Sequence, residues 1–330
     1  MSKCFSRREA LKAGALTGAV VALGGVGAAS IAAEAAAAQG AATPNAAAAK
    51  APMLTKAIPS TGENIPVVGL GTNQFGVDSD AEIAARREVL KRLPELGGAV
   101  IDTAPAYGRS EEVVGRLVRE LESRKQLFLA TKVTCPDGDI GASKVVIEQS
   151  FARLRADVID LLQVHSLTGT DALAPVMKEL KEAKRVRYLG ITTSRDEQHA
   201  EVAATLRKHP WDFVQVNYSI DDRDAEKEVL PLAQDRGVAV LINVPFGGRR
   251  GGSLFSRVGD KPLPKWAAEF DATSWAQFFL KYSLSHPAVT CAIPGMTKVA
   301  HLEDNAAGGK GRMPDAAMRQ RMQEFWATLS

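Results

Sequence analysis

The stretch IDTAPAYGRSEEVVG, residues 101–115, places Asp102 and Tyr107 five positions apart where an apolar run gives way to a loop. Two more polar residues close apolar runs further along the chain, since Lys132 ends LFLATK and His165 ends VIDLLQVH. In a parallel barrel the carboxyl ends of the strands gather on one face. We therefore expect these four side chains to meet at one site.

The surrounding sequence has the alternating pattern of strands and helices that is typical of such a barrel. From Ile65 onward, short apolar runs alternate with amphipathic segments, the pattern of parallel strands separated by helices. A capping box at Ser79 and Glu82 predicts one helix start, and apolar spacing over 143–154 predicts another helix. The predicted strands span residues 67–70, 99–102, 127–132, 158–165, 186–191, 213–217, 238–244 and 289–293. We predict an α/β fold, a single-domain (β/α)8 TIM barrel over residues 57–330.

The first 38 residues have the form of a twin-arginine signal peptide. Arg7 and Arg8 precede an uncharged run over 13–33 that is rich in Ala, Gly and Val. The run is about long enough to span a bilayer, which makes a membrane anchor the alternative, but its small residues and the A-x-A pattern at 36–38 favour cleavage. We expect the twin-arginine export machinery as a partner, a periplasmic location and no stable membrane anchor after cleavage. A cytoplasmic location is the alternative. Residues 39–56 are expected to form an Ala-rich disordered linker.

Charge and cysteine content exclude some classes of function. The chain has 41 Lys and Arg residues against 38 Asp and Glu. Removal of residues 1–38 takes away four basic and two acidic residues and leaves 37 against 36. A nucleic-acid partner therefore has no electrostatic support. Cys135 and Cys291 end different predicted strands without metal-ligand spacing, so no metal site is expected.

One connection is longer than the others. The segment FGGRRGGSLFSRVGDKPLPKWAAEF, residues 246–270, exceeds a simple βα loop. Its glycines leave backbone N–H groups accessible, while Arg249 and Arg250 add positive charge, and this combination suits a pyrophosphate. A flexible, solvated loop is the alternative interpretation.

Six motifs follow one another in register along the chain. They are GLGT at 69–72, IDTAPAYG at 101–108, TK at 131–132, QVH at 163–165, VQVNYS at 214–219 and IPGMTKVAHLEDN at 293–305. With these motifs the chain resembles an aldo-keto reductase along nearly all of the sequence after the signal. The resemblance implies a (β/α)8 barrel, a nicotinamide cofactor bound without a Rossmann motif, and a catalytic tetrad of Asp102, Tyr107, Lys132 and His165.

The tetrad suits the reduction of a carbonyl group. Hydride transfer develops negative charge on the carbonyl oxygen, which must be stabilised and protonated. A free tyrosine has a pKa of about 10, so Tyr107 needs the Lys132 ammonium beside it, and Asp102 makes burial of that ammonium tolerable. His165 is expected to orient the carbonyl by donating a hydrogen bond. Singly, the four residues also have ordinary structural interpretations, such as a turn cap, loop packing, a snorkelling lysine or a core histidine.

The resemblance also assigns cofactor contacts. Those near the nicotinamide are Gly71, Thr72, Asn73, Thr192, Thr193 and Gln215, and those near the adenine end are Gly295, Lys298, His301, Asp304 and Asn305. Phe246, Gly247 and Gly248 of the long loop are added because of the accessible backbone N–H groups there and the ring of Phe246. Asn243 stands where the family commonly has an aromatic residue that stacks on the nicotinamide, and Phe246 is the expected substitute. Lys298 is the clearest cation for a 2′-phosphate. We expect NADP(H) to be favoured over NAD(H).

The sequence thus predicts an NAD(P)H-dependent oxidoreductase that reduces small aldehydes or ketones to alcohols, with Tyr107 as the proton donor. The alternative is a cofactor-binding sensor or interaction protein on the same barrel with little turnover. A metal-dependent barrel hydrolase is disfavoured, because the sequence has no clustered His and carboxylate ligands for a metal ion. Phe75 and Trp266 are candidates to line an open substrate pocket, and ordinary loop packing is the alternative interpretation for both.

Overall fold

The computed structural model describes residues 51–248 and 252–329. The predicted signal peptide, residues 39–50 of the predicted linker, and Arg249 and Arg250 lie outside these residues. Within the described ranges, none of the helices has the length and apolar character needed to cross a membrane.

Eight strands form one sheet in which every neighbouring pair is parallel, and each strand pairs with the next strand along the chain. The strands are β3 (Leu70–Gly71), β4 (Val100–Asp102), β5 (Phe128–Val133), β6 (Ile159–His165), β7 (Val186–Thr192), β8 (Phe213–Asn217), β9 (Ala239–Asn243) and β10 (Val289–Ala292).

The first and last strands meet at a seam formed by residues 67–71 and 292–295. Parallel bridges join Val68 to Ala292 and Gly71 to Gly295. The backbone N–H of Gly71 donates to the Pro294 oxygen at 2.9 Å, and that of Gly69 donates to the Ala292 oxygen at 2.8 Å. The sheet therefore closes on itself, and the predicted (β/α)8 barrel is confirmed.

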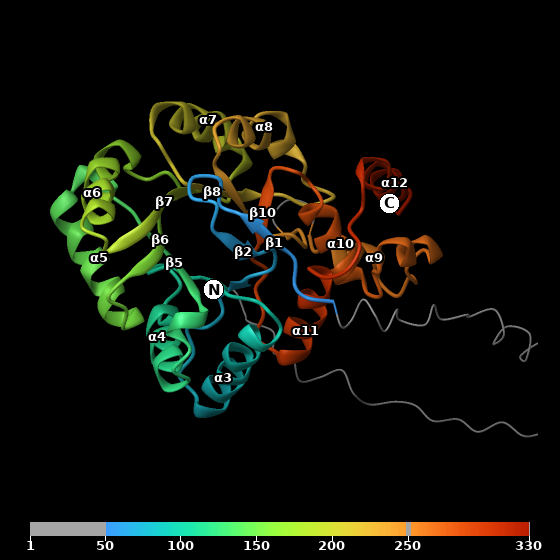
Figure 1. Ribbon diagram of the computed structural model, residues 1–330, viewed down its shortest axis with the longest axis horizontal. Coiled ribbons are helices and arrows are strands. Elements are labelled where there is room, and N and C mark those ends of the chain that lie inside the picture. Colours follow the sequence, from blue (N-terminus) through green and yellow to red (C-terminus); the bar gives the residue numbers. More distant parts are fainter. Residues whose placement is uncertain (1–50, 249–251, 330) are drawn as a thin grey trace, which may run out of the picture. The chain divides into compact units, whose positions relative to one another are not determined.

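Helices follow the strands and lie around the sheet, as Figure 1 shows. They are α3 (Asp80–Glu95), α4 (Ser110–Glu120), α5 (Ile140–Leu154), α6 (Thr170–Glu182), α7 (His199–Lys208), α8 (Val229–Asp235), α9 (Leu254–Val258), α10 (Trp275–Leu284), α11 (Val299–Gly308) and α12 (Ala316–Ala327). Short 3-10 helices connect them at η1 (Arg124–Gln126), η2 (Pro136–Gly138), η3 (Asp196–Gln198), η4 (Asp224–Lys227) and η5 (Lys265–Phe270).

Local signals set where these helices begin. The Ser79 hydroxyl accepts the Glu82 backbone N–H at 3.3 Å, which is the predicted N-cap contact, and it donates to the Glu82 carboxylate at 2.5 Å, so the carboxylate contacts the Ser79 hydroxyl. Helix α5 begins three residues before the predicted 143–154, because the Asp139 carboxylate caps the backbone N–H of Ala142 at 2.9 Å. Strand β5, with helices outside and side chains inside the barrel, is buried along its whole length.

A hairpin precedes the barrel, in a region where the sequence predicted none. Strand β1 (Thr55–Ala57) pairs antiparallel with β2 (Asn64–Pro66), and Met53 bridges to Lys310. The Lys56 ammonium donates to the backbone oxygens of Leu284, His286 and Val289 at 2.8, 3.2 and 2.5 Å, which ties the hairpin to the end of α10. The predicted disordered linker, residues 39–56, is therefore wrong over its last residues, 53–56.

The long connection after β9 contains structure of its own. Helix α9 and η5 occupy much of residues 246–270. The Phe246 ring packs on Phe255 with 5.1 Å between centroids, and Gly247 bridges to Ser253. The described part of this segment is thus folded against the barrel and is not a simple solvated loop.

Candidate active site

Asp102 and Lys132 form a buried ion pair at the carboxyl ends of β4 and β5. The Lys132 ammonium donates to both Asp102 carboxylate oxygens and to the Thr103 backbone oxygen, each at 2.7 Å. Only 1% of Lys132 and 2% of Asp102 is exposed. Burial raises the pKa of the Asp102 carboxyl, and the Lys132 charge opposes that rise. The geometry gives Lys132 a fixed orientation, with all three N–H donors satisfied.

Tyr107 and His165 lie beside this pair. The Lys132 ammonium is 5.1 Å from the centroid of the Tyr107 ring, and the Tyr107 and His165 rings meet edge to face at 6.1 Å. Burial, reinforced by the Lys132 charge, lowers the pKa of His165 to about 4. His165 is therefore neutral at pH 7, with one N–H donor and one acceptor nitrogen. The structure brings all four predicted catalytic side chains together.

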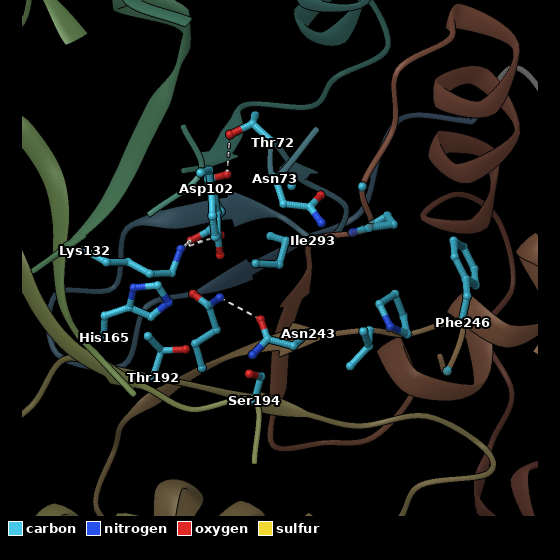
Figure 2. A pocket seen from close by; sticks show the side chains of 18 residues that line it. Thr72, Asn73, Asp102, Lys132, His165, Thr192, Ser194, Asn243, Phe246 and Ile293 are labelled. Carbon is cyan, nitrogen blue, oxygen red and sulfur yellow. Dashed lines mark hydrogen bonds and ion pairs between the residues drawn. The ribbon is translucent and has the colours of Figure 1, made fainter. Parts of the chain in front are cut away.

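A cavity of about 350 Å³ opens above these residues. Figure 2 shows Lys132 and His165 at one side of it and Phe246 at the opposite side. The residues that line it are Gly71, Thr72, Asn73, Asp102, Tyr107, Lys132, His165, Thr192, Ser194, Gln215, Asn243, Val244, Pro245, Phe246, Gly247, Ile293, Pro294 and Gly295.

Comparison with known proteins places this barrel in a family. The sequence model of the Aldo/keto reductase family matches residues 67–325. The chain belongs to this family. It is 34% identical to the aldo-keto reductase YhdN of Bacillus subtilis over 205 residues, which cover 56% of this chain and 60% of YhdN, less than two thirds of that protein.

Solved structures of aldo-keto reductases have the same fold. The holo form of one from Bacillus halodurans is 25% identical, with a TM-score of 0.67 over 82% of this chain and 96% of its own. One from Klebsiella pneumoniae in complex with NADPH is 23% identical, with a TM-score of 0.65 over 83% of this chain and 96% of its own. The resemblance that the six motifs indicated is confirmed.

The cavity of this aldo/keto reductase includes eight of the predicted cofactor residues. They are Gly71, Thr72, Asn73, Thr192, Gln215, Phe246, Gly247 and Gly295. Gly248 is exposed beyond the cavity. Phe246 lies at the side away from Lys132 and His165 and packs on Phe255, so its position does not suit stacking next to the tetrad.

Thr193 was predicted to contact the cofactor and does not line the cavity. Its hydroxyl donates to Gln198 at 2.5 Å, and the residue is 1% exposed. Side chains alternate between the two faces of an extended strand. Thr192 and Ser194 therefore share the cavity face, and Ser194 is a lining residue that the sequence analysis missed.

Of the predicted adenine-end residues, Gly295 lines the cavity, whereas the other four lie on or next to α11 and outside it. Lys298 precedes the first turn of this helix and is exposed, as is His301. The Asp304 carboxylate accepts hydrogen bonds from Ser274 at 2.8 Å and Gln277 at 2.7 Å, and Asn305 is buried. These contacts tie α11 to α10.

The two predicted pocket aromatics also lie elsewhere. Phe75 is fully buried under Arg86, whose guanidinium is 5.7 Å from the ring centroid. Trp266 packs among aromatic rings of η5, α10 and α12, including Phe278 at 5.7 Å and Phe325 at 5.6 Å. Of the two interpretations, ordinary packing therefore holds for both residues, because aromatic residues near strand ends also serve the packing of outer helices.

Further lining residues escaped sequence reasoning. Val244 has a φ of 40°, a conformation that a β-branched residue rarely adopts and that costs on the order of 1–3 kcal/mol. This turn directs Val244 and Pro245 toward the cavity. Gln163 is fully buried and does not line the cavity, but its amide donates to Asp102 at 3.3 Å. Its place two residues before His165, on the same strand face, was a usable signal for this contact.

Asn243 is held by two hydrogen bonds where stacking was expected. Its amide nitrogen donates to the Thr193 backbone oxygen at 3.0 Å, and its amide oxygen accepts from Gln215 at 2.6 Å. This wall of the cavity is a polar amide network.

Proposed function

We propose that this aldo/keto reductase is an NAD(P)H-dependent oxidoreductase that reduces small aldehydes or ketones to alcohols. The observation that carries the proposal is the position of Tyr107 and His165 in the cavity, next to a fully hydrogen-bonded Lys132–Asp102 pair. A phenol and a neutral imidazole side by side are suited to bind and protonate a carbonyl oxygen.

The lining residues fit a nicotinamide ring. The amide oxygen of Gln215 is buried and has no hydrogen-bond partner among the described residues, so it offers an acceptor for an amide N–H. At Gly71 a Cβ would lie 2.7 Å from the Ile293 oxygen, so only glycine leaves the backbone in this position at the cavity wall. Thr72 and Asn73 continue that wall. A reduced nicotinamide held there supplies the hydride.

NADP(H) is the proposed cofactor in preference to NAD(H). The similar Klebsiella pneumoniae structure holds NADPH, and the exposed Lys298 offers a cation at the start of α11. Replacement of Lys298 by Ala should weaken NADPH binding about tenfold, the effect of losing one charged contact, and leave NADH binding unchanged. Equal effects on both cofactors would contradict this assignment.

Each tetrad residue has a distinct part in the proposed reaction. Neutral His165 donates its N–H to the carbonyl oxygen and orients it. Tyr107 donates the proton to that oxygen as charge develops. The Lys132 ammonium stabilises the phenolate that Tyr107 becomes, and Asp102 keeps this ammonium charged and fixed in place.

The variant Tyr107→Phe tests the proton donor. Loss of a general acid should lower turnover by about 10²- to 10⁴-fold, while NADPH binding, followed by fluorescence titration, stays at the parent level. Carbonyl-dependent loss of NADPH absorbance measures turnover. Reduction at the parent rate by this variant would remove Tyr107 from the mechanism.

A second candidate is a cofactor-binding sensor or interaction protein with little turnover. The hydrogen-bonded Asn243, in place of an aromatic ring, favours this candidate. Tight binding of NADPH without reduction of any member of a broad aldehyde panel would establish it.

We also propose that residues 1–38 direct export through the twin-arginine machinery to the periplasm. The double variant Arg7→Lys, Arg8→Lys keeps the charge and should retain the protein in the cytoplasmic fraction. Unchanged distribution between the fractions would contradict the proposed signal.

A further inference from the structure

The amide of Asn243 can take only one orientation. Its nitrogen donates to the backbone oxygen of Thr193 at 3.0 Å. A backbone carbonyl accepts and never donates, so the Asn243 amide must turn its N–H side toward Thr193. The Asn243 oxygen is thereby directed to the other side, toward Gln215.

This orientation determines that of Gln215. The Gln215 amide nitrogen donates to the Asn243 oxygen at 2.6 Å. A turned Gln215 amide would bring two oxygens together at this short separation. The amide oxygen of Gln215 is left without a partner among the described residues, in a side chain that lines the cavity and is 2% exposed.

We infer that Asn243 is a positioning residue that fixes the Gln215 amide with its oxygen free, so that the cavity selects a nicotinamide substituent that carries an N–H donor. This inference rests on the proposed function and deepens it. The chain of directed hydrogen bonds runs from the Thr193 carbonyl through Asn243 to Gln215. A carboxamide completes the chain, whereas a ring substituent without N–H leaves a buried acceptor unpaired.

The experiment compares two cofactors that differ at this one group. NADP⁺ carries a carboxamide, and its 3-acetylpyridine analogue keeps the carbonyl but has a methyl group in place of the NH₂. Dissociation constants are measured by equilibrium dialysis without a carbonyl substrate. An unpaired buried acceptor should make the parent protein bind the analogue about 10- to 100-fold more weakly.

Three variants separate the contributions of Gln215 and Asn243 to the ratio of the two dissociation constants. Gln215→Leu removes the acceptor and should bring the ratio of the two dissociation constants close to one. Asn243→Leu leaves Gln215 in place but releases its amide, and the ratio should fall most of the way toward the Gln215→Leu value. Gln198→Leu is the matched control, since it makes the same amide-to-leucine change outside the cavity, and it should keep the parent ratio.

The inference is overturned if the parent binds the analogue and NADP⁺ with equal dissociation constants. It is also overturned if Asn243→Leu keeps the parent ratio of the two constants while Gln215→Leu brings that ratio to one. If Asn243→Leu does not fold, Asn243→Ala supplies the same comparison. A general loss of structure weakens both cofactors alike and leaves the ratio unchanged, so the ratio isolates positioning from stability. Failure of the parent to bind either cofactor would refute the proposed function itself.

Discussion

Separation of the Asp102–Lys132 pair should destabilise the protein, and the loss should depend on pH in the variant that keeps Asp102. Both side chains are almost completely buried, and the Lys132 ammonium has only oxygen neighbours at 2.7 Å, two from Asp102 and one from Thr103. Loss of one partner from a buried pair costs about 3–5 kcal/mol, because the remaining charge is left uncompensated. Asp102→Asn and Lys132→Met should each lose about that much unfolding free energy.

The direction of this pH dependence follows from proton binding by Asp102. In Lys132→Met the buried carboxylate lacks its cation, and burial already raises the pKa of Asp102. The folded variant then binds a proton more readily than the unfolded chain, so its stability should fall as pH rises. The slope reaches at most about 1.4 kcal/mol per pH unit for one group.

Urea denaturation between pH 5 and 9 measures the pH dependence of Lys132→Met and the loss of stability in both single variants, relative to the parent. The double variant Asp102→Asn, Lys132→Met carries neither charge and should cost less than the sum of the single variants. A stability of Lys132→Met that rises with pH would refute the description of a buried, charged pair. Single-variant losses below about 1 kcal/mol, the range of an exposed ion pair, would refute it as well.

Three further predictions concern the cavity. The pKa of His165 is lowered to about 4, so protonation of this residue opposes folding, and stability should decline as the pH falls from 6.5, the usual pKa of histidine, toward 4. The variant His165→Asn should show a shallower decline in thermal melts. An unchanged pH dependence in this variant would argue against a buried neutral imidazole. Gly71→Ala should lower the free energy of unfolding by about 1–3 kcal/mol, since its Cβ would lie 2.7 Å from the Ile293 oxygen. Urea denaturation measures this loss. Stability equal to that of the parent would mean that the backbone at the seam moves to accommodate the added methyl group. The charges of Asp102 and Lys132 cancel, and the other described lining residues carry no formal charge at pH 7. An aldehyde that carries an uncharged ester should therefore have a kcat/KM about tenfold or more above that of the same aldehyde with a free carboxylate. A preference for the carboxylate would contradict a neutral pocket.

The sequence was sufficient to predict which strand ends carry the four tetrad residues. Lys132 and His165 each end an apolar run, and a polar group in such a position faces the open end of a barrel. The hairpin at 55–66 escaped prediction because strands of three residues show no measurable alternation. The tie between Lys56 and the end of α10 joins segments more than 200 residues apart, which no local pattern reveals.

Errors at the cavity came from transferring roles by motif position without strand geometry. Thr193 follows Thr192 in sequence but faces away, and Ser194 takes the cavity face. The network of Asn243, Gln215 and Thr193 links three strand ends by hydrogen-bond direction. Sequence identifies such amides as polar but does not indicate which way they turn.

The seam described above also affects how the barrel fluctuates. Strand β3 has only two residues, and the junction with the last strand depends on a few hydrogen bonds from Gly69, Gly71 and Ala292. Local opening starts where few such bonds must break, so amide hydrogens at this junction should exchange with solvent sooner than those between β5 and β6. Gly71 and Gly295 belong to both the junction and the cavity wall. Slower hydrogen exchange at the seam would therefore report occupancy of the cavity directly, for any ligand and without turnover.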